Sequence, residues 1–219
     1  MTSRALGVGS ALIGVSLIAW AVVVHQTQGM DMGPSADLGG LAWYTGLWVA
    51  MTAAMMLPSS TPTVLLVDRL SRPATPRFLA GYLVAWTAFG LAAYGLARAA
   101  VAGGVGHAGA AGPLIAAAGL YGLTPLKRAC LKHCRHPLAF LMRHASLGPV
   151  RTGVLHGAYC VGCCAGLMVV LFAVGMMSVF WMVVVTAVIA AERIAPFGER
   201  LVTPIGVALV ATGCLLVLT

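Results

Sequence analysis

Five of the six cysteines fall into two short groups whose spacing places thiols on one side of a helix. Cys160, Cys163 and Cys164 stand in the segment Cys-Val-Gly-Cys-Cys, and Cys130 and Cys134 are four residues apart. Residues three or four apart share a helix face, so each group presents neighbouring sulfurs. Thiolates that are not bridged are ligands for soft metal ions, and Cu(I) in particular suits them. Three thiols on one face indicate metal or thiol chemistry more strongly than they indicate packing.

Methionines continue the pattern on two apolar segments. Met168 lies four residues beyond Cys164, so the same helix face carries a further sulfur. On a second segment Met51 and Met55 share a face, and Met56 follows directly. Methionine is also an ordinary filler of hydrophobic cores, so each thioether is a weaker candidate than the thiols.

Further candidates stand near the ends of the apolar segments, and each has a simpler reading beside the metal one. They are His25, Met30, Met32, His133, Met176 and Met177. The first three predict an outer loop that exchanges copper, although a polar loop with chance methionines fits equally. His133 either completes a cytoplasmic site beside Cys134 or belongs to a basic interfacial helix.

The composition requires a lipid environment for the elements that position these residues. The chain is 60% hydrophobic and only 8% charged, whereas roughly a quarter of the residues of a soluble domain are charged. The net charge of +8 comes from basic residues in short segments between apolar runs, where membrane orientation explains them, so we exclude nucleic acid as a partner. The sequence contains no phosphate-binding loop and no spacing typical of a Ser-His-Asp site, and we do not expect an enzyme.

The apolar runs predict an all-α bundle of about seven transmembrane helices forming one domain over residues 1–219. The expected helices are 5–24, 41–67, 78–98, 108–128, 152–174, 178–192 and 200–218. The uncharged run over 152–191 would make a rod of about 60 Å, twice the hydrocarbon thickness, so we expect a hairpin near 175–178. With the N-terminus cytoplasmic and the C-terminus outside, every Lys and Arg except Arg98 falls on the cytoplasmic side. We therefore expect a multi-pass protein of the inner, cytoplasmic membrane.

Three local features lead to further expectations. Pro58 frees the carbonyl of Ala54 inside a helix, and the serines and threonines that follow it can satisfy the opened backbone. Trp43, Tyr44 and Trp48 lie near a predicted outer helix end, which favours the headgroup layer. Glu192 stands beside an arginine at a predicted cytoplasmic helix end, where an interfacial ion pair explains it.

At these residues the chain resembles the bacterial predicted metal-binding integral membrane protein family, whose members are linked to copper supply for tyrosinase-type and multicopper oxidases. The matching stretches are 51–58, 124–127 with the cysteines that follow, 160–164 with the next methionine, and 175–177. The resemblance implies a metal role for eight positions: Met51, Met55, Cys130, Cys134, Cys160, Cys163, Cys164 and Met168.

We favour a protein that binds Cu(I) and acts as a chaperone or transfer path toward a copper enzyme outside the cytoplasm. One alternative is a membrane thiol-disulfide oxidoreductase that uses Cys160 and Cys163 as a Cys-x-x-Cys pair. The other is a structural or assembly subunit whose sulfurs only pack. Membrane lipid is a partner in each case, and the sequence allows an oligomer.

Overall fold

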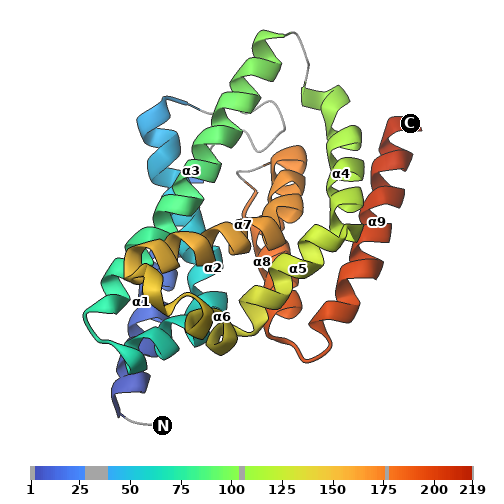
Figure 1. The fold of residues 1–219 in the computed structure, drawn as a ribbon. Coiled ribbons are helices and arrows are strands. Elements are labelled where there is room, and N and C mark those ends of the chain that lie inside the picture. Colours follow the sequence, from blue (N-terminus) through green and yellow to red (C-terminus); the bar gives the residue numbers. More distant parts are fainter. Residues whose placement is uncertain (1–2, 28–38, 104–106, 176–177, 219) are drawn as a thin grey trace. The chain divides into compact units, whose positions relative to one another are not determined.

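The computed structural model describes residues 3–27, 39–103, 107–175 and 178–218, and over these residues the chain is helical (Figure 1). Its elements are α1 (Ser3–Thr27), α2 (Leu41–Leu70), α3 (Ala74–Ala102), α4 (His107–Leu123), α5 (Pro125–Arg135), α6 (Pro137–Arg143), the 3₁₀ turn η1 (Ala145–Leu147), α7 (Pro149–Val174), α8 (Val179–Ile194) and α9 (Gly198–Leu218). The expected all-α fold is confirmed.

Within the described residues, five helices are long and apolar enough to cross a membrane, which is consistent with a multi-pass membrane protein. They are Ala5–Thr27, Leu41–Leu70, Ala74–Ala100, Pro149–Val174 and Gly198–Leu218. Large apolar side chains on α1 and α9 face outward: Leu17, Ile18 and Leu215 are 64%, 66% and 64% exposed. Such surfaces suit lipid tails, whereas a soluble monomer rarely exposes contiguous apolar patches of this kind. The helices α4 and α8 are shorter, with 17 and 16 residues.

Prolines set the starts of three helices. Pro125, Pro137 and Pro149 each stand at the first helical position, where the missing N–H costs no hydrogen bond. Pro125 also disfavours the helical conformation for the residue before it, which is Thr124. Thr124 is accordingly not helical and separates α4 from α5. The single helix expected over 108–128 is therefore wrong at its end, because a separate basic helix begins at Pro125.

The long apolar run breaks where the sequence predicts a break. Helix α7 ends at Val174, and Gly175 has φ of 110°, a backbone conformation open to glycine and strained for other residues. The amide of Ser178 then donates to the carbonyl of Gly175 (3.1 Å), and α8 begins at Val179. The predicted interruption of the 152–191 run is confirmed.

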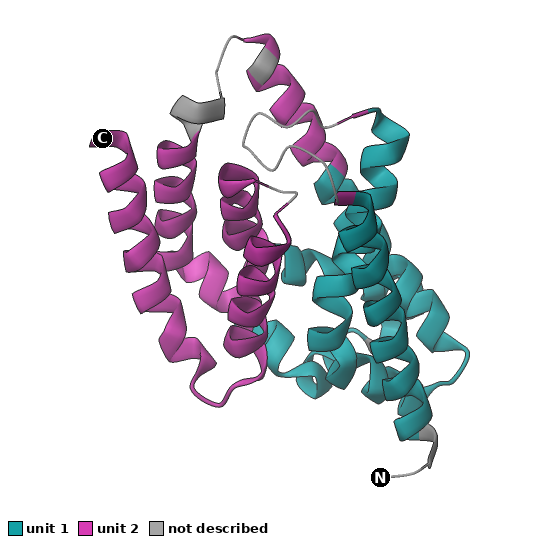
Figure 2. Cartoon of the chain, turned by 180° about the vertical axis from the view of Figure 1, so that it is seen from behind, with its two compact units in different colours: residues 1–26, 40–90, 132–161 teal, residues 27–39, 91–131, 162–219 magenta. Residues whose placement is uncertain are grey.

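The chain divides into two compact units, each described here by itself (Figure 2). Unit 1 comprises residues 1–26, 40–90 and 132–161, and unit 2 comprises 27–39, 91–131 and 162–219. In unit 1 helices α2 and α6 pack together. Its apolar core consists of Leu12, Val64, Val67, Phe78, Phe140 and Leu141.

Within unit 1, a neighbouring helix satisfies the carbonyl that Pro58 leaves open in α2. The hydroxyl of Ser16 in α1 donates to the carbonyl oxygen of Ala54 (2.7 Å), and this bond is buried. The residues we expected in this role bond elsewhere, because Ser59 and Ser60 both donate to the carbonyl of Met56. The opened carbonyl is thus satisfied from outside α2. Ser60 also lies near a further partner, which is described below.

The aromatic residues near the start of α2 pack inside unit 1 rather than facing headgroups. Tyr44 and Trp48 are 1% and 4% exposed, and their rings stack 5.9 Å apart. Their polar atoms donate to carbonyls of α3, Tyr44 to Gly90 (3.1 Å) and Trp48 to Trp86 (2.9 Å). For these two residues the expectation of a headgroup anchor is corrected, because a buried ring with a polar atom needs a partner and α3 supplies it. Trp43, the third residue of the expected group, is half-buried.

Close packing of small residues joins α4 and α9 in unit 2. A methyl group added to Gly119 would lie 2.6 Å from the amide nitrogen of Val210, and one added to Gly213 would lie closer still to the backbone of Ala116. Gly119 has its counterpart Gly206 on α9, so glycines on both helices let the two backbones approach.

Unit 2 also contains a buried ion pair. The ammonium of Lys127 lies 2.8 Å from the carboxylate of Glu192, with the side chains 5% and 2% exposed. The partner of Glu192 expected from the sequence was a neighbouring arginine, whereas the structure brings Lys127 to it from α5. This buried pair joins α5 to α8.

Candidate metal centre

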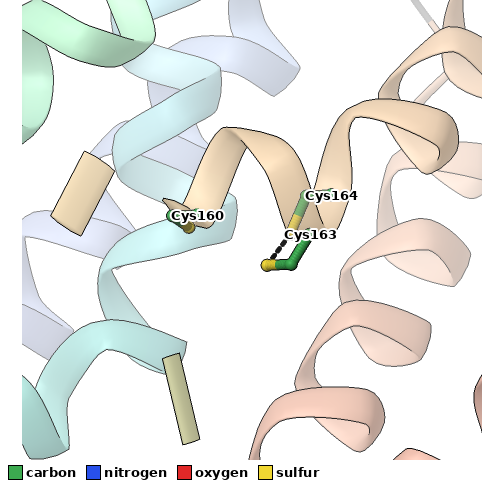
Figure 3. A group of neighbouring side chains, drawn as sticks. All are labelled: Cys160, Cys163 and Cys164. Carbon is green, nitrogen blue, oxygen red and sulfur yellow. Dashed lines mark hydrogen bonds between the residues drawn. The ribbon is translucent and has the colours of Figure 1, made fainter. Parts of the chain in front are cut away.

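Three cysteine thiols gather on α7 (Figure 3). The sulfurs of Cys160, Cys163 and Cys164 all lie within 4.8 Å of one another, and those of Cys163 and Cys164 are 3.3 Å apart. All three side chains are buried, with exposed fractions of 0%, 1% and 1%. The group comes from one turn and a half of a single helix, so the sequence spacing itself produces the convergence.

The spacing of these sulfurs fits a shared metal ion. Three sulfurs about 2.3 Å from one ion, the distance known for thiolate bonds to Zn²⁺, lie roughly 4.0 Å apart in a trigonal plane. The observed group is within reach of that arrangement after small side-chain rotations. None of the six cysteines forms a disulfide in this structure, so the sulfurs remain available as ligands. A donor set made only of thiols favours a soft ion such as Cu(I).

In unit 1 a tyrosine hydroxyl contacts the group. The hydroxyl of Tyr82 on α3 lies 3.2 Å from the sulfur of Cys160, and the hydroxyl of Ser60 on α2 lies 3.1 Å from that of Tyr82. Tyr82 and Ser60 are each 1% exposed. When Cys160 is a thiolate, Tyr82 donates its hydrogen bond to the sulfur, so α2 and α3 both support this ligand.

Glycines on α7 allow Tyr82 to approach. A methyl group added to Gly157 would lie 2.7 Å from the β-carbon of Ala85 and 2.9 Å from the carbonyl of Tyr82. Gly153 lies still closer to the carbonyl of Phe78. Sequence reasoning missed Tyr82, but the Gly153-x-x-x-Gly157 spacing, typical of close helix contacts in membranes, was a readable signal that α7 faces another helix here.

In unit 2 a fourth thiol lies against the same turn of α7. A methyl group added to Gly162 would lie 2.6 Å from the sulfur of Cys130, so the missing side chain of Gly162 leaves the space that this thiol occupies. The hydroxyl of Tyr121 donates to the carbonyl of Gly162. Burial raises the pKa of the Cys130 thiol, so the protonated form is favoured and a metal ion that binds there must displace a proton.

The remaining predicted ligands are placed as follows. Met51, Met55 and Met56 are buried on α2, Met168 is buried on α7 and Cys134 is buried on α5. His25 is exposed in the last turn of α1, and the half-buried ring of His133 stacks on Tyr159 with centroids 4.3 Å apart. Met30, Met32, Met176 and Met177 lie outside the described residues. Of the predicted set, the structure therefore brings three cysteines together and adds Cys130 beside Gly162.

The apolar helices and the buried three-thiol group define a metal-binding membrane protein with a donor set suited to copper. The model of the PpoB2 copper chaperone family matches residues 45–216, most of the chain. The chain belongs to this family. Neither the comparison with curated proteins nor the comparison with solved structures gives a match.

Proposed function

We propose that the protein binds Cu(I) at Cys160, Cys163 and Cys164 and passes it to a copper enzyme outside the cytoplasm. The observation that carries this proposal is the buried group of three thiols in a chain of the copper chaperone family. Thiolate ligands stabilise the monovalent ion, and release needs only exchange with other sulfurs or histidines rather than covalent chemistry.

Cys130 is the neighbouring ligand from which the ion enters the three-thiol group. Its sulfur lies against Gly162. In the sequence, Gly162 stands between Cys160 and Cys163. It stands on α5, whose last turn carries Lys132, His133 and Arg135 and therefore suits a membrane surface. Transfer from a thiol near the surface to thiols deeper in the bundle requires similar affinities at the two places.

The proposal includes a topology and an acceptor. The chain crosses the cytoplasmic membrane seven times, with the N-terminus inside and the C-terminus outside, and α4 and α8 supply the two crossings beyond the five long helices. Met168, buried four residues beyond Cys164 on α7, continues the row of sulfurs along that helix, and Met51 and Met55 on α2 are further thioether candidates. The acceptor is a tyrosinase-type or multicopper oxidase, in line with the resemblance of the sequence.

Copper analysis of the purified protein tests the proposal. The wild type and the Cys160→Ser, Cys163→Ser and Cys164→Ser variants are loaded with Cu(I) in lipid nanodiscs under argon, and bound copper is measured with X-ray absorption of the metal. We expect sulfur-only coordination in the wild type and loss of tightly bound copper in each variant. Cys214→Ser is the matched control, because Cys214 is the exposed thiol on α9.

Two results would contradict the proposal. A variant in which Cys160, Cys163 and Cys164 are all changed to Ser should bind no copper tightly. Copper retained in it with unchanged sulfur coordination would place the ion elsewhere. A reversible disulfide between Cys160 and Cys163 in a protein that binds no copper would favour the oxidoreductase alternative. Delivery is checked separately: the loaded wild type should activate a copper-free tyrosinase-type enzyme, and the Cys163→Ser variant should not.

A further inference from the structure

Unit 1 carries a second site of different chemistry, where α5 passes into α6. A pocket of about 200 Å³ is lined by Lys132, His133, His136, Ala139, Phe140 and Arg143. Lys132 supplies an ammonium group and Arg143 a guanidinium group, and the two imidazoles add ring nitrogens that can donate. None of the six lining residues is acidic. This donor set matches a phosphate group, which guanidinium and ammonium groups bind by charge-assisted hydrogen bonds.

The floor of this pocket is held by ring packing. The ring of His133 is parallel to that of Tyr159, with 4.3 Å between centroids and 3° between planes. Phe140 is 2% exposed and meets Tyr159 edge-on at 5.9 Å. The histidine is thereby fixed before any ligand arrives, so less side-chain freedom is lost on binding than in a pocket of free side chains.

The residues beside the pocket are apolar and exposed. Leu138 and Met142, four residues apart on α6, are 54% and 73% exposed, and each directly precedes a residue that lines the pocket. A short helix with an exposed apolar edge and adjacent cations is the pattern of a helix lying in the membrane interface. A free inorganic anion would make no use of that edge, whereas the acyl chains of a lipid would contact it.

We propose that this pocket binds the phosphate of an anionic phospholipid, with the acyl chains beside Leu138 and Met142. Basic pockets at the membrane surface select anionic headgroups, since each Lys or Arg near the surface adds a favourable term. The inference is independent of copper binding. Lys132 and Arg143 would then bind a specific lipid headgroup, in addition to the general effect of basic residues on the orientation of the chain in the membrane.

Lipid retention measured by native mass spectrometry tests this site. The protein is released from mixed nanodiscs of phosphatidylcholine and phosphatidylglycerol, and the ratio of the two retained lipids is recorded. We expect the wild type to retain phosphatidylglycerol preferentially. In Lys132→Gln/Arg143→Gln the ratio of retained phosphatidylglycerol to phosphatidylcholine should fall about tenfold. Arg69→Gln/Arg72→Gln removes the same number of exposed charges, one from the last turn of α2 and one from the α2–α3 connection, both outside the pocket, and should keep the preference.

Each outcome decides the question. Equal loss in both double variants would mean that bulk charge acts and would overturn the site, as would full retention in Lys132→Gln/Arg143→Gln. Displacement of phosphatidylglycerol by millimolar inorganic phosphate would overturn the lipid and leave a free-anion site. Because the substituted side chains are exposed, the single variants Lys132→Gln and Arg143→Gln serve as folded intermediates that should each show part of the loss.

Discussion

The hydroxyl of Tyr82 is the residue-scale contact that sequence reasoning could not supply. It lies 3.2 Å from the sulfur of Cys160, yet the two residues are 78 positions apart. The three thiols were predictable because five consecutive residues on one helix fix their spacing. Tyr82 was not, because its place depends on which face of α3 packs on α7.

Tyr82→Phe removes the hydroxyl and leaves the three thiols in place. We expect copper still to bind, with an affinity lowered by roughly tenfold to a hundredfold, the usual effect of losing a hydrogen bond to a metal ligand. Competition titration against a Cu(I) chelator under argon measures the change. Tyr94→Phe is the control, because the hydroxyl of Tyr94 donates to the carbonyl of Gly39. Equal affinities of the two variants would remove Tyr82 from the site.

Gly162→Ala tests the space occupied by Cys130. The new methyl group would lie 2.6 Å from the Cys130 sulfur, which must rotate away, while the three thiols of α7 keep their positions. We expect slower copper loading with an unchanged final copper content, followed by stopped-flow mixing with a Cu(I) donor. Gly95→Ala adds the same methyl group where nothing lies within 4 Å. Loading at the same rate in both variants would show that Cys130 is not on the entry path.

At the scale of elements, the breaks between helices were more readable than the contacts between them. The length of the uncharged 152–191 run predicted a break near 175, and Gly175 ends α7 there in a conformation that is strained for other residues. The break at Thr124 was missed because apolar character continues through it to Leu126. The hydrogen bond from Ser16 to Ala54 could not be predicted either. A carbonyl freed by proline needs a donor, but the sequence does not show which helix provides it.

Gly157→Val should separate α3 from α7. Its side chain would meet the β-carbon of Ala85 and the carbonyl of Tyr82, and backbone atoms cannot rotate out of the way. Overpacking of this kind costs about 1–3 kcal/mol, and the contact from Tyr82 to the thiol group should be lost with it. Thermal unfolding in detergent and copper affinity measure the two effects. Gly46→Val on α2, where nothing lies within 4 Å, should change neither; a normal affinity in Gly157→Val would contradict the coupling.

At the scale of the whole molecule, the composition of 60% hydrophobic and 8% charged residues predicted a lipid environment, and the lengths of the apolar runs predicted an all-helical fold. The pairing of buried charges could not be predicted from the sequence. Glu192 was expected at an interface, yet it is 1% exposed and pairs with Lys127, which lies 65 positions earlier. Only the fold brings those two charges together.

The buried pair predicts an asymmetric response to substitution. Lys127→Met leaves the carboxylate of Glu192 buried without its cation, which should destabilise the protein by about 3–5 kcal/mol. The double variant Lys127→Met/Glu192→Leu should recover most of this loss, because it removes both charges. Thermal unfolding of the two variants is compared with that of Arg128→Met, an exposed neighbour that donates to Thr203. A Lys127→Met protein as stable as Arg128→Met would disprove the role of the pair.

The ligand atoms of the thiol group on α7 are all sulfurs. Such a group selects ions that are soft and polarisable rather than ions that are abundant. Mg²⁺ and Ca²⁺ prefer oxygen and gain little from it, however concentrated they are. Silver, monovalent and soft, should occupy the same three sulfurs. Under the proposed function, silver should lower the activity of the copper enzyme that the chain supplies, and excess copper should restore it.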